Sequence, residues 1–131
     1  MSSSTRLGLI PLANVQSEDQ GTEGRVWLSH NEDPQFLLGS THLTLQGGWY
    51  LFEANFEKVD GLLVSPCLYP DYGTGLAESE RISLPEPEEN GRVNAVVLLK
   101  RSVIRLRFDP SSKVARFRLS DVGLRRLSRV E

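Results

Sequence analysis

The chain has 131 residues, a formal net charge of −2, 39% hydrophobic residues and 24% charged residues. These values fit one folded domain with a single core and exclude a disordered chain. The near-neutral net charge gives no general reason to expect a nucleic-acid or membrane-surface partner. One cysteine, Cys67, is present. It cannot form an internal disulfide, and its apolar sequence context predicts a buried thiol.

Strand patterns recur along the first half of the chain, and helix patterns are nearly absent. Short strands are expected over residues 6–15, 25–29, 35–38 and 41–45. Residues 49–56 give the clearest central strand, because polar and apolar side chains alternate. One face, predicted to point into the core, carries Tyr50, Phe52, Ala54 and Phe56. Trp49 is predicted to point outward among polar residues.

The second half continues in the same way. Further strands are expected over residues 61–68, 81–84, 92–99 and 121–129, with a long loop over 69–79. Within the acidic turn 85–91, the pair Asn90-Gly91 is a strong signal for chain reversal. Alternation over 103–109 and again over 115–120 predicts a β-hairpin with an apolar inner face and a basic outer face.

Short strands separated by turns every ~8–12 residues, about eight to ten strands in all, are typical of a sandwich or barrel. We therefore expect an all-β fold: a two-sheet antiparallel, jelly-roll-like sandwich formed by residues 1–131 as a single domain. The polar start is not followed by a long apolar run, and no stretch approaches the ~20 apolar residues of a membrane-spanning helix. We expect a cytoplasmic protein without membrane insertion and without a nucleic-acid partner.

The charges are unevenly distributed. Residues 100–131 contain ten basic and three acidic residues, a local net charge of +7, and the rest of the chain carries −9. Either the basic strands pair with acidic neighbours across a sheet, or they form a basic face that meets an acidic partner, phosphate or lipid headgroups. The sequence leaves both interpretations open.

Standard catalytic and cofactor motifs are missing from the sequence. It has no phosphate-binding glycine loop, no zinc-protease motif, no nucleophile elbow and no cysteine pairs spaced for zinc. We therefore expect no catalytic residues, no metal site and no cofactor, and we predict that the isolated domain is not an enzyme.

The most unusual stretch is residues 65–80, which combine aromatic and acidic side chains between glycines. Together with the outward Trp49, the candidate ligand-binding residues there are Tyr69, Asp71, Tyr72, Glu78 and Glu80. Aromatic rings stack on sugar C–H surfaces and carboxylates accept bonds from sugar hydroxyls, so this mixture suits glycan binding. Alternatively, the carboxylates hold Ca²⁺, or the loop only closes one end of the sandwich.

Four stretches together carry a family resemblance. They are Gly48-Trp49-Tyr50 and the residues 66–80, 103–110 and 117–126. In this order they resemble the N-terminal β-domain that precedes the catalytic domain in large bacterial glycosyltransferases of cell-surface polysaccharide synthesis. The resemblance covers about residues 47–129, and the chain departs from the family pattern at Leu76-Ala77, where Phe-Ser is usual.

The resemblance implies a non-catalytic accessory β-sandwich that binds glycan or packs on a C-terminal catalytic domain of the same chain. Two alternatives come from the residues themselves. One is a protein–protein interaction domain that uses a basic sheet face. The other is a small jelly-roll enzyme acting on sugars, for which Glu78 and Glu80 would need a facing carboxylate.

Overall fold

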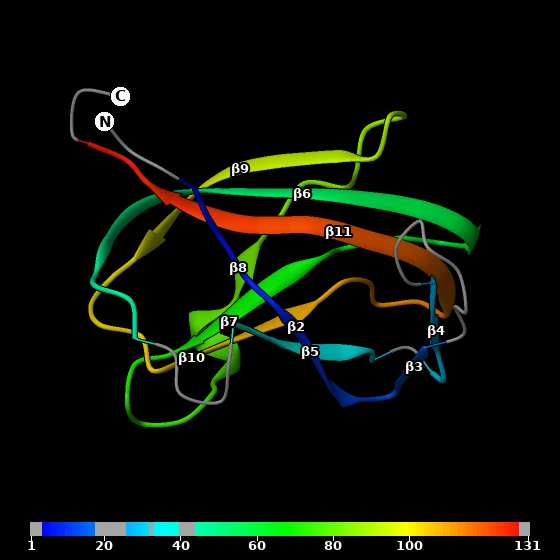
Figure 1. Cartoon of the computed structure of the whole chain (residues 1–131). Helices are drawn as coiled ribbons and strands as arrows, with labels where there is room; N and C mark the ends of the chain where they lie inside the picture. Colours follow the sequence, from blue (N-terminus) through cyan, green and yellow to red (C-terminus); the bar gives the residue numbers. More distant parts are fainter. Residues whose placement is uncertain (1–3, 18–25, 32, 40–43, 129–131) are drawn as a thin grey trace.

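A computed structural model of the chain describes residues 4–17, 26–31, 33–39 and 44–128 and shows a sandwich of two antiparallel sheets (Figure 1). The predicted fold class is confirmed. In Figure 1, β9, β6 and β11 lie side by side in one layer, and β7, β10 and β5 lie in the other. The described residues form eleven strands and one short 3₁₀ turn, η1 (Glu78–Glu80).

The six-stranded sheet has the order β3-β4-β11-β6-β9, and β1 also pairs with β11. Its strands are β1 (Ser4–Arg6), β3 (Val15–Ser17), β4 (Val26–Ser29), β6 (Gly48–Gly61), β9 (Arg92–Leu99) and β11 (Ala115–Arg126). The long strands β6 and β11 lie at its centre, and β9 is an edge strand.

The five-stranded sheet has the order β2-β5-β10-β7-β8. Its strands are β2 (Leu9–Ala13), β5 (Gln35–Leu38), β7 (Cys67–Asp71), β8 (Ile82–Ser83) and β10 (Arg105–Asp109). The centre of this sheet, β10, pairs with β5 on one side and with β7 on the other.

Aromatic side chains from both sheets meet in the core. Phe52 and Phe56 of β6 have ring centroids 5.7 and 6.1 Å from that of Phe108 on β10. Phe56 also contacts Phe117 of β11, at 5.4 Å. Aromatic pairs at these separations add to the stabilisation from buried area. The predicted inward face of β6 is confirmed, since Tyr50, Phe52, Ala54 and Phe56 are buried.

The predicted hairpin between residues 103–109 and 115–120 is wrong. β10 pairs with β5 and β7, whereas β11 pairs with β1, β4 and β6. The connection over 110–114 therefore passes from one sheet to the other. The alternation of polar and apolar residues identifies the side chains that face the core. It does not show whether two strands pair within one sheet or face each other across the sandwich, because the pattern is the same in both cases.

The strand expected over 61–68 is only partly present, because residues 62–66 form a connection between β6 and β7. Ser65 has a φ of +55°, a left-handed conformation that regular strands do not use. Since β7 includes Tyr69 and Asp71, the loop that was expected to begin at residue 69 begins after β7.

The expected N-terminal strand over 6–15 is divided among β1, β2 and β3, which belong to different sheets. The strand expected over 92–99 is confirmed as β9, and the segment after residue 120 continues β11 to Arg126. Residues 41–43 of the strand expected over 41–45 lie outside the described residues. Over the described residues, no helix is long and apolar enough to span a membrane.

Candidate functional site

Asp71, one of the predicted ligand-binding residues, organises the loop that follows β7. Its Oδ1 accepts hydrogen bonds from the backbone N–H groups of Gly73 and Gly75, at 2.8 and 3.0 Å. Its Oδ2 accepts two more from Arg105, from Nη2 at 2.8 Å and Nε at 3.1 Å. The bond from Gly73 and the Arg105 guanidinium hold the pKa of the buried Asp71 carboxyl below its usual value. Asp71 is therefore occupied by internal partners.

Tyr69 and Glu78 are joined to each other. The Tyr69 hydroxyl donates a hydrogen bond to Glu78 Oε1 at 2.9 Å, which ties β7 to η1. The Arg107 guanidinium lies over the Tyr69 ring, with Cζ 4.4 Å from the ring centroid. Burial and the bond to Glu78 raise the pKa of the Tyr69 phenol. Tyr69 is 9% exposed, with one ring face covered by Arg107 and its hydroxyl bonded to Glu78, so it is held by internal contacts.

Tyr72 and Glu80 hold the same loop against the end of β9. The backbone N–H of Lys100 donates to the Tyr72 hydroxyl at 3.1 Å, and Lys100 Nζ donates to Glu80 at 2.9 Å. Arg101 lies over the Tyr72 ring, with Cζ 4.6 Å from the centroid. These contacts match the interpretation of residues 65–80 as a loop that closes one end of the sandwich. Within the described residues, no group of three or more metal-ligating side chains could hold an ion.

Trp49 differs from the other predicted site residues because its side chain lies on an exposed apolar surface. It points outward from β6, as the sequence predicts, and is 53% exposed. Leu98 lies directly opposite Trp49 on β9, and Val96 lies directly opposite Leu51. Leu98 and Val96 are 41% and 60% exposed. We call these four residues, Trp49, Leu51, Val96 and Leu98, the Trp49 patch.

The open edge of β9 runs beside the Trp49 patch. The Phe56 N–H donates to Gly91 O, so Phe56 and Gly91 form a hydrogen-bonded pair. Such pairs alternate along antiparallel strands, so every second residue of β9 after Gly91 bonds to β6 and the residues between them do not. The backbone groups of Asn94, Val96 and Leu98 therefore point away from β6. The edge is closed before and after this stretch, because Arg92 O accepts from Glu88 N and Lys100 N donates to Tyr72. Within the described part of the chain, the outward backbone groups of these three residues have no hydrogen-bond partner, and we call this stretch the open edge of β9.

The basic residues of the C-terminal region do not form one surface. Arg105 and Arg107 lie on the outer face of the five-stranded sheet, where their carboxylate partners are Asp71 and Asp109, at 2.8 and 2.7 Å. On the other outer face, Arg118 lies 3.3 Å from Glu57. Arg125 lies 3.9 Å from Glu53 on that face. These four arginines therefore fit the first interpretation of the charge distribution, in which basic residues pair with acidic neighbours, and not the second, in which they form one basic face.

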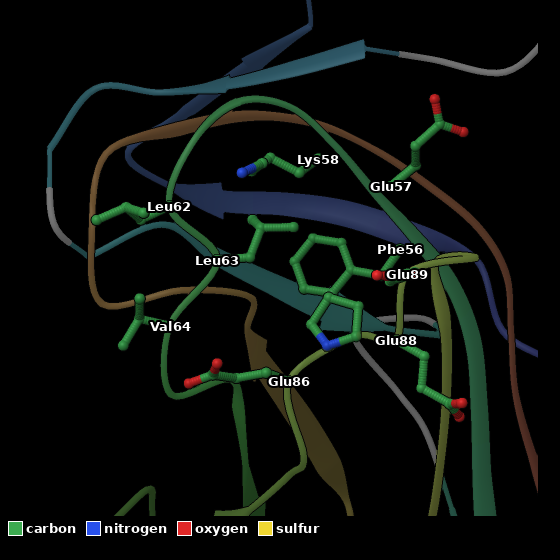
Figure 2. Close-up of a pocket in the computed structure, with 10 residues that line it drawn as sticks. Phe56, Glu57, Lys58, Leu62, Leu63, Val64, Glu86, Glu88 and Glu89 are labelled. Carbon is green, nitrogen blue, oxygen red and sulfur yellow. The ribbon is translucent and has the colours of Figure 1, made fainter.

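A pocket of about 450 Å³ lies where the β6–β7 connection meets the β8–β9 connection (Figure 2). Apolar side chains form its floor and one wall, and charged side chains form the rest of the lining. The lining residues are Phe56, Glu57, Lys58, Leu62, Leu63, Val64, Glu86, Pro87, Glu88 and Glu89. In Figure 2 the Phe56 ring and Leu63 occupy the centre, and Glu86 and Glu88 extend from the facing segment.

Sequence reasoning missed this pocket. The sequence predicts a strand that includes residues 62–64 and an acidic turn that includes 86–89, and no pattern in it joins two segments so far apart along the chain. The unusual density of glutamates in 85–91 was the one available signal.

Comparison with protein-family models, curated proteins and solved structures gave no match. The resemblance to the accessory domain of bacterial glycosyltransferases therefore stays a prediction.

Proposed function

We propose that this chain is a non-catalytic accessory module that docks on a partner protein domain through the Trp49 patch. The observation that carries the proposal is the adjacency of Trp49, Val96 and Leu98, which lie on neighbouring strands and are each about half exposed. Exposed apolar side chains gathered in one place mark interaction surfaces, and tryptophan is enriched among the residues that dominate binding energy.

The neighbours of Trp49 favour a protein over a sugar as the docked partner. Val96 and Leu98 offer only hydrocarbon surface, which a protein interface buries well and sugar hydroxyls do not. The open backbone edge beside them also suits a polypeptide partner, because an added strand can satisfy its N–H and C=O groups.

The non-catalytic part of the proposal is supported by the candidate carboxylates. Asp71 is held by Arg105, Glu80 by Lys100, and Glu78 by the Tyr69 hydroxyl. A general acid or base must be free to reach a substrate proton, whereas these groups have structural partners. The sequence resemblance supports a glycosyltransferase catalytic domain in the same polypeptide as the partner, acting in cytoplasmic synthesis of cell-surface polysaccharide.

A photo-crosslinking amino acid at position 49, introduced in cells of the native host, tests the docking proposal. We expect crosslinks to one defined surface of one polypeptide, and we expect Val96→Arg to abolish them. The same amino acid at Thr74, an exposed loop residue outside the patch, is the matched control. No crosslink at position 49, or the same products from both positions, would refute docking through the patch.

Glycan binding is the second candidate, because the Trp49 ring is exposed and polar residues continue the same outer face at Glu53 and Asn94. Saturation-transfer NMR with a panel of bacterial glycans separates the two candidates. Transfer that is lost in Trp49→Ala and kept in Tyr72→Ala would assign the patch to a glycan. If the patch docks on a protein instead, we expect no saturation transfer from the wild type or from either variant to any glycan.

A further inference from the structure

The pocket in Figure 2 combines an apolar floor with three carboxylates, those of Glu86, Glu88 and Glu89, that have no partner among the residues the structure describes. We propose that it binds the side chain of a lysine or arginine from a partner protein segment. The aliphatic stem of that side chain would lie on the floor, and its cationic head would meet the glutamates. This site is separate from the Trp49 patch, because Trp49 and Phe56 are seven residues apart along β6, about 23 Å in an extended strand.

The floor is suited to a hydrocarbon stem. Phe56 and Leu63 are almost fully buried and form the base of the pocket, and Leu62 is 56% exposed at its rim. Lysine and arginine side chains commonly lay their methylene groups along apolar surface while the charged end stays hydrated.

The rim is suited to a cation. Glu86, Glu88 and Glu89 line the pocket, and among the described residues no hydrogen bond or ion pair engages their carboxylates. In contrast, Glu80 pairs with Lys100 at 2.9 Å. The lining has four glutamates and one basic residue, Lys58. Because Arg118 pairs with Glu57 at 3.3 Å, the lining and Arg118 together carry a formal charge of −2. A basic side chain would neutralise part of this charge.

Both walls are held in place without a ligand. On the acidic side, Glu88 N donates to Arg92 O at 3.0 Å and Gly91 N donates to Glu88 O at 2.8 Å. On the apolar side, Ser111 Oγ accepts from Val64 N at 3.0 Å and donates to Leu62 O at 2.8 Å. A preformed pocket loses little conformational entropy on binding. Its volume also lies in the range of ordinary ligand pockets.

The test is a titration of the ¹⁵N-labelled chain with two short blocked peptides, followed by NMR chemical shifts. The first peptide is acetyl-Ala-Leu-Lys-Leu-Ala-amide, and the second has norleucine in place of lysine. We expect saturable shifts confined to residues 56–64 and 86–91 with the lysine peptide and none with the norleucine peptide. Binding should weaken as salt is raised, because the contact is electrostatic.

Two charge-matched variants make the result specific. Glu86→Gln should weaken binding about threefold to fivefold, the effect of removing one partly exposed charge pair. Glu78→Gln changes the net charge equally, keeps an oxygen for Tyr69 and lies outside the pocket, so it should bind like the wild type. Leu62→Ser tests the floor and should also weaken binding. The dispersion of each variant's spectrum shows that it is folded.

Four outcomes would overturn the proposal: equal weakening by Glu78→Gln and Glu86→Gln, equal binding of the norleucine peptide, shifts spread over the whole surface, or no shifts at about 10 mM peptide. A spermidine titration tests the source of the cation. If spermidine binds more tightly than the lysine peptide and shifts the same residues, the ligand of the pocket is a free polyamine and not a protein segment. None of these outcomes depends on the Trp49 patch.

Discussion

Asp71 and Arg105 lie directly opposite each other on β7 and β10, and the Arg105 guanidinium donates two hydrogen bonds to a single oxygen of the Asp71 carboxylate. The Asp71 side chain is 3% exposed, whereas that of Arg105 is 41% exposed. The other oxygen of Asp71 accepts from Gly73 and Gly75. One buried carboxylate thus joins the centre of the five-stranded sheet to the loop that closes the end of the sandwich.

Asp71→Asn should lower the free energy of unfolding by about 2 kcal/mol, because a buried carboxylate loses its charge-assisted hydrogen bonds. The pKa of Asp71 is lowered in the folded state, so its contribution is complete above the unfolded value of about 3.9 and is lost as the pH falls below it. Urea denaturation at pH 7 and at pH 3 measures the difference between the two proteins, which should shrink at pH 3.

Glu78→Gln is the control for Asp71→Asn, because it removes a charge from the same loop at an exposed position. It should leave stability within about 0.5 kcal/mol of the wild type. If the free energies of unfolding of Asp71→Asn and the wild type differ by the same amount at pH 7 and at pH 3, the charge of the Asp71 carboxylate has no part in holding the loop.

Two glycines with positive φ separate backbone strain from crowding. Gly61 has a φ of +83°, and a Cβ there would lie 2.6 Å from Val114 O and 2.9 Å from Ala115 Cα. Gly73 has a φ of +114°, and a Cβ there would meet nothing within 4 Å. Gly73→Ala should therefore lower stability by about 1 kcal/mol through strain alone, and Gly61→Ala by about 3 kcal/mol because crowding is added. Equal losses in thermal or urea unfolding would contradict this assignment.

The sequence predicted the sandwich and the inward faces of its strands because alternation is a local property. Tyr50 and Phe52 on β6, and Leu106 and Phe108 on β10, are all buried as the pattern requires. Strand partners are not local. The tight connection between β10 and β11 resembled a hairpin turn, but it carries the chain across the core, because each of these strands finds other partners in its own sheet.

The candidate site was predictable only in part, for a related reason. The composition of residues 65–80 predicted one loop, but part of this stretch is β7, and the partners of its side chains, Arg105 and Lys100, come from later in the chain. Trp49 was correctly placed outward. Its apolar surroundings depend on the strand register, which sets Leu98 opposite Trp49. This register could not be predicted, because the pairing of β6 with β9 was not known from the sequence.

Cys67 should be inert to thiol reagents in the folded protein. It is buried on β7, and burial together with the nearby Asp109 carboxylate raises the pKa of its thiol. Because the thiolate is the reactive form, both access and ionisation are suppressed. With Ellman's reagent at pH 8, labelling should be limited by unfolding, and it should become fast in concentrated urea. Rapid labelling of the native chain would show that the sheet opens locally at β7 without global unfolding.

Val96→Lys should reduce self-association of the isolated chain. Val96 is 60% exposed, lies in the Trp49 patch and sits in the middle of the open backbone edge of β9. Exposed apolar edge strands pair with other chains, and a lysine on the edge is a common way in which proteins prevent this. In sedimentation velocity at rising concentrations, we expect weak association of the wild type and its loss in Val96→Lys.

Val114→Lys makes the same chemical change at an exposed valine in the β10–β11 connection, away from the β9 edge, and should associate like the wild type. If both variants lose association equally, the added charge alone is responsible and the β9 edge has no special part in it. If the wild type stays monomeric at every concentration, the three open residues of the edge are too few to pair two copies. Trp49→Ala separates the side-chain contribution of the patch from that of the backbone edge, because it removes apolar surface and leaves the edge of β9 unchanged.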